Sequence, residues 1–137
     1  EMIRVAAGEP LSVKQEDIHL QGHAMECRIN AEDPAHHFRP CPGVIEAIHL
    51  PGGNGVRIDT AAYNGYEIPP FYDSMIAKVI VHGRTRQEAI DKMRSTLGEL
   101  IIDGVTTNVD FQYEILDNED FQAGEITTDF IPMHFNL

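Results

Sequence analysis

Arg28 is the first residue whose type and position could do chemistry. It lies in the middle of HAMECRIN, residues 23–30, where apolar and polar residues alternate. On a β-strand, Glu26 and Arg28 share one face while Cys27 and Ile29 share the other, so the second face should be core. The polar face is either a solvated surface with a weak Glu26–Arg28 ion pair, or a site where a permanent guanidinium charge, oriented by Glu26, stabilises an anion.

Asp73 is the second candidate for chemistry. It follows Tyr72 in EIPPFYDSMIAK, residues 67–78, and comes directly before a nearly continuous apolar run. Pro69 and Pro70 restrict the backbone that leads to it. An aspartate at the start of a buried strand is either a structural cap or a site residue, and the pattern leaves both interpretations open.

Other motifs favour no chemistry. GGNG, residues 52–55, has no following Lys-Ser/Thr and opens no helix, so it indicates a turn and not a P-loop. The seven histidines include the pair His36 and His37 but no HxxxH or HExxH, and no metal site is expected. No serine lies in a nucleophile-elbow context. Cys27 and Cys41 form no CxxC motif, so a reduced pair is the default and a disulfide the alternative.

The composition indicates a globular domain and excludes two classes of partner. The chain has 137 residues, of which 42% are hydrophobic, which is enough for a core. Its net charge of −12 argues against nucleic acid and against an anionic membrane surface. No apolar run approaches the roughly 20 residues that a bilayer span needs. Because signal-peptide features are missing and the cysteines favour a reducing compartment, a cytoplasmic protein is expected.

The elements that must position these residues begin with strands. Residues 18–30 predict two extended runs that turn at Gly22. Residues 43–50 alternate as a half-buried strand, and residues 74–83 form an apolar run typical of a buried strand. Gly-rich stretches at 52–55 and 64–65 are hairpin signals between them. Ahead of the strands, residues 2–6 have the pattern of a helix tail ended by Gly8 and Pro10, which suggests a fragment of a longer chain.

Helices are predicted in the second half. Thr85 and Glu88 form a capping box, and apolar residues then recur at helical spacing up to Ile101, before Asp103-Gly104 ends the helix. A second helix is expected from about 107 to 116, a turn around 117–122 ended by Gly124, and a last extended piece over 127–135. This pattern predicts an α+β fold, with a largely antiparallel sheet from the first half packed against helices from the second half.

Five stretches carry more information together than separately. They are HAMECRINAEDP, FRPCPGVI, PGGNGVRID, PPFYDSMIAKVI and ELIIDGVTTN. In this order and spacing they resemble the C-terminal domain of biotin carboxylase, the ATP-dependent component of acetyl-CoA carboxylase. The resemblance runs through essentially the whole chain, and it implies that residues 1–137 form one domain of a longer ATP-grasp enzyme.

The resemblance implies the activity of that parent enzyme. Enzymes of this family spend ATP to activate bicarbonate as carboxyphosphate, and CO2 then joins N1 of the ureido ring of biotin on a biotin carboxyl carrier protein. ATP, Mg²⁺ and bicarbonate would be bound mainly by upstream domains, so this chain alone is expected to be inactive. The implied partners are the carrier protein, the carboxyltransferase component and a second copy in a homodimer, and the implied pathway is malonyl-CoA and fatty acid synthesis.

Three residues receive roles at the biotin site from this resemblance. Arg28 matches the arginine of the C-R-I-N-A-E-D-P motif, which contacts the ureido oxygen of biotin. Asp73 matches the aspartate of the P-P-x-Y-D-S-M motif near the biotin pocket, with a positioning role, and Tyr72 beside it is expected to support the site. Glu26 remains the expected support for Arg28.

Three more residues receive peripheral roles from the resemblance. Arg57 and Asn54 match the homodimer interface, where a relative carries an aromatic residue at the Asn54 position. Thr128, next to Thr127, matches a segment that borders the adenine pocket, and some relatives carry an aliphatic residue there.

Several alternatives stay open from the sequence. The same domain could belong to a pyruvate, propionyl-CoA or methylcrotonyl-CoA carboxylase, although ECRINAEDP favours the acetyl-CoA type. It could also be a non-catalytic module that dimerises through the Arg57 loop, or a plain structural domain, which requires that Arg28 point into bulk water.

Overall fold

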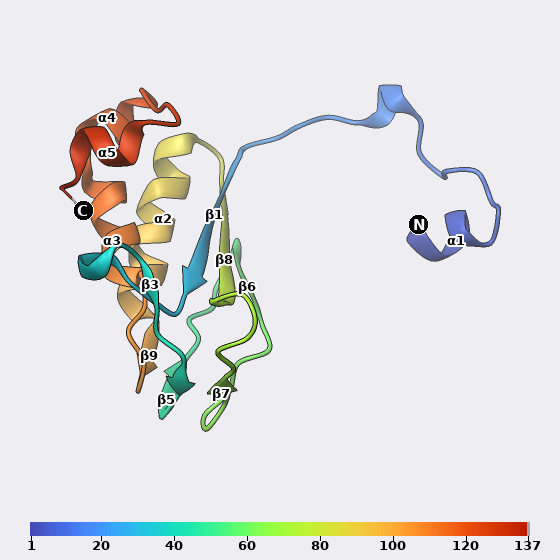
Figure 1. Ribbon diagram of the computed structural model, residues 1–137. Coiled ribbons are helices and arrows are strands. Elements are labelled where there is room, and N and C mark those ends of the chain that lie inside the picture. The colour runs from blue at the N-terminus through green and yellow to red at the C-terminus, as the bar shows by residue number, and fades with distance from the viewer. Residues whose placement is uncertain (137) are drawn as a thin grey trace.

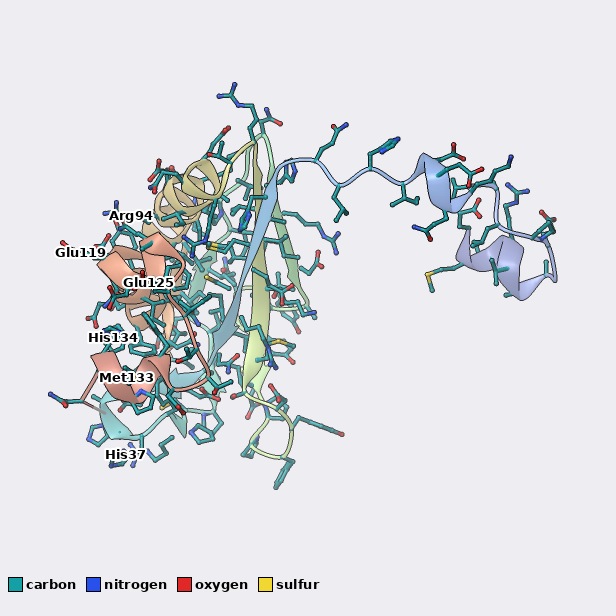
Figure 2. The ribbon with its side chains drawn as sticks, turned by 90° about the horizontal axis from the view of Figure 1, so that it is seen from above. His37, Arg94, Glu119, Glu125, Met133 and His134 are labelled. Atoms are coloured by element: carbon teal, nitrogen blue, oxygen red, sulfur yellow. The ribbon has the colours of Figure 1, made fainter. Side chains whose placement is uncertain are left out.

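The chain forms an α+β domain preceded by an extended arm. The computed structural model describes residues 1–136 (Figure 1). The arm, residues 1–22, contains the short helix α1 (Met2–Ala6) and the 3-10 turn η1 (Gln15–Asp17), and every one of its residues is exposed. Figure 2 shows it reaching away from the domain with its side chains pointing into solvent. Gly8, at φ 85°, follows α1 as the sequence predicts.

A three-stranded antiparallel sheet is the centre of the domain. Its strands are β1 (His23–Asn30), β8 (Met75–Gly83) and β6 (Val56–Thr60), in the order β1-β8-β6. The predicted buried strand is therefore the central one, while the run before Gly22 is not a strand. Alternation in β1 is as predicted, because Cys27 and Ile29 are buried and their neighbours are not.

Short strand pairs continue below this sheet. They are β2 (Glu32–Asp33) with β3 (Arg39–Pro40), β4 (Gly43–Val44) with β7 (Glu67–Ile68), and β5 (Ala47–His49) with β9 (Ile101–Asp103), and the 3-10 turn η2 (Pro34–His36) connects β2 to β3. All of these pairs are antiparallel.

The two Gly-rich stretches are turns but not hairpins. Gly53, Gly55 and Gly65 have φ values of 150°, 72° and 85°, as tight turns require. The strands on either side of each turn belong to different sheets, however, because β5 pairs with β9, β6 with β8, and β7 with β4. Local turn chemistry therefore predicted the change of direction, and long-range pairing selected the partners.

Helix α2 (Arg86–Glu99) covers one face of the three-stranded sheet and packs against β8 and β1 (Figure 1). Thr85 accepts a hydrogen bond from the backbone N–H of Glu88 at 3.2 Å, as the capping box predicts. The Glu88 carboxylate returns to the N–H of Arg84 instead of Thr85, at 3.1 Å. The apolar face of α2 contributes Ala89, Ile90, Met93 and Leu97 to the core, all at most 2% exposed.

The predicted end of α2 is wrong by a few residues. The helix stops at Glu99, and Ile101–Asp103 forms β9 against β5, where Ile102 lies opposite Ile48. Leu100 and Ile101 continue the helical spacing in sequence, but pairing with β5 prevails over that local pattern. Gly104 then turns at φ 97°, where a Cβ atom would clash with the carbonyl oxygen of Val44.

Three shorter helices complete the domain on the side of α2. Helix α3 (Val109–Asp117) agrees with the prediction, whereas α4 (Glu119–Ala123) is a helix where a turn was expected. Asn118 caps α4 by accepting from two backbone N–H groups, and Gly124 ends it at φ 85°. A short polar helix of this kind has little apolar periodicity, which is why the sequence pattern missed it.

The C-terminal piece is also helical and not extended as predicted. Helix α5 (Phe130–His134) lies beside α4 (Figure 1). Pro132 occupies the first turn, where its missing N–H has no intrahelical partner to lose. The ring centroids of Phe130 and Phe121 lie 6.1 Å apart, and His134 Nε2 lies 3.4 Å from Asp120 Oδ2. These tertiary contacts with α4 stabilise the helix.

The overall α+β prediction is confirmed, with antiparallel sheets and helices on one side. None of the helices in the described part of the chain combines the length and apolar character that crossing a bilayer requires.

Candidate biotin site

Arg28 lies on the uncovered face of the three-stranded sheet. It is exposed, and across the sheet it stands opposite Lys78 of β8, which in turn stands opposite Asp59 of β6. The face opposite α2 therefore carries two cations and one carboxylate in a single row. The Arg28 Nε–H group points at the sulfur of Met75, 3.2 Å away.

Asp73 lies in the turn that enters β8. Its Oδ1 atom accepts a hydrogen bond from the N–H of Met75 at 2.8 Å, so its carboxylate is fixed by the turn it starts. Tyr72 beside it is 82% exposed. Both residues line an open cleft of about 520 Å³, together with Met75, Lys78 and other residues of β6–β8.

Met75 is the point where the two candidates meet. Its sulfur contacts Arg28, its backbone N–H binds Asp73, and its side chain lines the cleft. Arg28 itself is outside the lining of the cleft and stands at its rim, one strand away. The arrangement presents a guanidinium and a carboxylate beside one concave, largely apolar surface, and such a surface suits a small ring with a polar head.

Glu26 lies in the same cross-sheet row as Arg57, with the central strand β8 between them. It stands opposite Ile80, which stands opposite Arg57. Among residues 1–136, no ion pair joins Glu26 to Arg28. The predicted support of Arg28 by Glu26 therefore has no direct contact behind it and stays a prediction.

Arg57 is engaged within its own strand. It forms a two-pronged ion pair with Asp59, at 2.8 and 2.5 Å. This hydrogen bonding raises the pKa of Arg57 and lowers the pKa of Asp59, and the negative charge of Glu26 adds a smaller effect on Arg57. Asn54, three residues before, is exposed in the turn ahead of β6. Both predicted interface residues are therefore accessible to solvent.

Thr128 is exposed in the segment between α4 and α5. Its neighbour Thr127 lines a second, smaller groove of about 280 Å³ between β1 and the helices, with Met25, Phe121 and Phe130 among its walls. Thr128 does not line that groove.

The cysteines take no part in a reactive site. Both thiols are free, so the alternative of a disulfide is wrong. Burial raises the pKa of the Cys27 thiol to about 12, with a smaller contribution from the charge of Glu26. Cys27 is therefore a protonated core residue near neutral pH. In the part of the chain that the structure describes, no three His, Cys, Asp or Glu side chains gather in a way that could hold a metal ion.

Three polar residues at this site were not singled out from the sequence. Ser74 donates a short hydrogen bond to the carboxylate of Glu32, and the carbonyl of Ser74 accepts from the N–H of Ala31 at 2.8 Å. Asn108 bonds to β1 on both sides of Ile29. Each belongs to one of the five motif stretches, but partners 42 to 80 residues apart leave no local signal.

Comparison with known proteins assigns the family. Residues 26–133 match the family described as "Biotin carboxylase C-terminal domain". The chain is 53% identical to biotin carboxylase 1 of Bacillus subtilis over 131 residues, which covers 96% of this chain and 29% of that protein. It is 55% identical to a pyruvate carboxylase subunit of Methanothermobacter thermautotrophicus, again over 131 residues, with 96% and 27% covered. The chain belongs to the biotin carboxylase C-terminal domain family.

Solved structures agree with this assignment at the level of the fold. The biotin carboxylase domain dimer of the 2-oxoglutarate carboxylase from Hydrogenobacter thermophilus, in complex with MgADP, ADP and bicarbonate, superposes with a TM-score of 0.94 at 47% identity. That match covers 96% of this chain and 29% of that one. The biotin carboxylase subunit of pyruvate carboxylase gives the same TM-score at 48% identity. The chain thus spans less than a third of the relatives that it matches.

Proposed function

We propose that this chain is the biotin-binding C-terminal domain of a longer ATP-dependent biotin carboxylase. The observation that carries the proposal is the meeting of Arg28 and Asp73 at Met75, beside the cleft. Family membership supports ATP-dependent carboxylation of biotin as the reaction of the parent enzyme. The cleft supports biotin binding as the role of this domain in that reaction. ATP and Mg²⁺ would be bound mainly by upstream domains of the parent enzyme and would supply the energy to activate bicarbonate.

Arg28 is the proposed catalytic residue. When a base in the upstream part of the full-length enzyme takes the proton of N1 of the ureido ring, the electron pair delocalises onto the ureido oxygen, and the same nitrogen then forms its new bond to the carbon of CO2. A guanidinium near that oxygen stabilises the charge that develops in the transition state more than it stabilises neutral biotin. Arginine also offers a planar pair of donors in a fixed geometry, which lysine lacks.

Asp73 is the proposed positioning residue on the other side of the cleft. Its Oδ1 atom is already used by the N–H of Met75, so its second oxygen is the one that can face a ligand. A carboxylate accepts from a ureido N–H or orients the guanidinium at the rim. Tyr72 is exposed enough to close over a ring that lies in the cleft.

The acyl acceptor is proposed from the ECRINAEDP motif, which favours the acetyl-CoA type. The biotin carboxylase and the pyruvate carboxylase relative match the chain at 53% and 55% identity, so overall similarity does not separate them. We favour the acetyl-CoA type, with a carrier protein and a carboxyltransferase component as partners, malonyl-CoA as the product for fatty acid synthesis, and the cytoplasm as the location. Two free cysteines are consistent with a reducing compartment.

A homodimer of the parent enzyme is also proposed. Arg57 and Asn54 are exposed on β6 and in the turn before it, and the Hydrogenobacter thermophilus relative is a dimer. The alternative is a module that only dimerises. Sedimentation of the chain with and without biotin separates the two, because only the biotin site predicts a ligand-dependent change.

The test is Arg28→Ala in the full-length enzyme. Loss of one donor to a developing oxyanion is expected to reduce the turnover of biotin by about 10² to 10³-fold. Arg84→Ala is the matched control, since Arg84 is an exposed arginine that pairs with Glu88 at the start of α2. Carboxylation of free biotin is measured for both variants, and a loss of less than a few-fold for Arg28→Ala would contradict the proposal.

A further inference from the structure

Asn108 is a buried polar residue that the proposed function leaves without a role. It is 5% exposed and stands directly before α3, in the N-cap position. An asparagine there usually accepts hydrogen bonds from the first turn of its own helix. The side chain of Asn108 makes no such bond. By contrast, Asn118 caps α4 in the usual way.

The amide of Asn108 is directed at the backbone of β1 instead. Its Oδ1 atom accepts from the N–H of Asn30 at 2.9 Å, and its Nδ2 group donates to the carbonyl of Arg28 at 3.1 Å. The backbone N–H of Asn108 donates to the carbonyl of Asn30 at 3.1 Å. Asn108 therefore bonds to the free edge of β1 as a neighbouring strand would, over the residues on either side of Ile29.

The location of these bonds coincides with an irregularity in the sheet. The pairing of β1 with β8 shifts between Ile29 and Asn30, one residue after Arg28. A bulge changes the direction of nearby side chains and weakens the hydrogen-bond ladder on which they depend. Bonds from Asn108 to both sides of the shift compensate for that loss, so the direction of the Arg28 side chain depends on them.

The residues that follow Asn30 connect β1 to the turn that holds Asp73. After Asn30, the N–H of Ala31 binds the carbonyl of Ser74, and the carboxylate of Glu32 accepts from the Ser74 hydroxyl. Ser74 is next to Asp73. Any shift of β1 at Asn30 therefore alters the position of Arg28 relative to Asp73.

We infer that Asn108 is a positioning residue for biotin carboxylation, which acts by holding Arg28 at the rim of the cleft through the β1 backbone. The inference rests on the proposed function of Arg28. It predicts a selective defect, because Asn108 acts on the half of the reaction that needs biotin and leaves ATP cleavage alone.

The experiment compares Asn108→Ala and Asn108→Asp in the full-length enzyme. Aspartate keeps an oxygen for the N–H of Asn30 and nearly the same side-chain volume, but it places an acceptor against the Arg28 carbonyl and so removes that bond. Small misplacement of a catalytic group costs up to about 100-fold. We expect kcat for free biotin to fall by about 10- to 100-fold in both variants, while bicarbonate-dependent ATP hydrolysis without biotin and the KM for ATP stay within about twofold.

Asn118→Ala is the matched control. It removes an asparagine cap from a helix of the same domain and lowers the melting temperature, but it touches neither β1 nor the cleft. Its biotin turnover is expected to stay within about threefold of the parent enzyme.

Two results would overturn the inference. One is full biotin turnover in Asn108→Asp. The other is an equal loss of biotin carboxylation and of ATP hydrolysis without biotin, which indicates a structural role only. Arg28→Ala distinguishes failure of the proposed function from failure of this inference. If Arg28→Ala retains biotin turnover, both are contradicted. If Arg28→Ala loses biotin turnover while Asn108→Asp retains it, only the positioning role of Asn108 is contradicted.

Discussion

One face of β1 packs under α2 while the other meets solvent, although both come from the same eight residues. Cys27 and Ile29 face the core at 6% and 0% exposure. Glu26 and Arg28 face outward. The inward residues stabilise the strand by apolar burial, and the outward residues are then free to be charged. The position of Arg28 therefore depends on buried side chains on the opposite face of its own strand.

Truncation of the inward face is the largest test of this comparison. Ile29→Ala is expected to lower the free energy of unfolding by about 2–5 kcal/mol, because it leaves a cavity in a packed core. Arg28→Ala, one residue away, should change it by only about 0.5 kcal/mol. Urea denaturation of the two variants measures the difference, and similar losses in both would contradict the division between the faces.

The pH dependence of the free energy of unfolding tests the burial of Cys27 on the inward face of β1. Cys27 has a folded pKa of about 12 against an ordinary value of 9.0. Between these values the unfolded chain releases the thiol proton and the folded chain keeps it, so the stability that is fully present below about pH 9 is lost as pH rises toward 12. Denaturation midpoints of wild type and Cys27→Ala, compared from pH 7 to 11, should show a steeper fall for wild type. Parallel curves would contradict the assignment.

On the outward face, Arg28→Lys separates charge from geometry. Lysine keeps the positive charge but lacks the planar pair of donors, and its ammonium is more strongly hydrated. In the full-length enzyme, kcat for biotin is expected to fall about tenfold, which corresponds to roughly 1.4 kcal/mol of transition-state stabilisation. Turnover equal to that of the wild type would indicate that charge alone is sufficient.

The substitution Met75→Leu is expected to have the smallest effect. It tests the residue that contacts both Arg28 and Asp73. Leucine conserves volume, so stability should change by less than about 1.5 kcal/mol. The sulfur that Arg28 contacts at 3.2 Å is lost, however, while the backbone bond to Asp73 remains. A decrease of about threefold in kcat for biotin is expected, and steady-state kinetics of the full-length enzyme measures it. An effect as large as that of Arg28→Lys would mean that Met75 has a more direct role.

The sequence predicted the elements that local chemistry determines. Alternation in β1, the apolar run of β8 and the cap at Thr85 all agree with the structure. The prediction from sequence was wrong where contacts between residues far apart in the chain determine the secondary structure. Ile101 continues the spacing of α2, yet its segment pairs with β5 more than 50 residues before it.

The candidate site shows the same limit. Arg28 and Asp73 were found from their motifs, and the structure brings both to Met75. The sequence places Asn108 only near the start of the helix that is expected from about residue 107. Its actual partners on β1 are 78 and 80 residues away, and no local pattern could identify them.

The side chain of Asn108 also bears on how this protein behaves at high concentration. An edge strand with unpaired N–H and C=O groups is a template on which a second molecule can add a strand and begin an aggregate. At Arg28 and Asn30 those groups are occupied by the side chain and backbone of Asn108, and the Arg28 carbonyl also accepts from Gln112 Nε2 at 3.5 Å, so they are not free to pair with a strand of a second molecule. The helix α3 side of the domain thus blocks strand addition at the part of β1 that carries the proposed catalytic arginine.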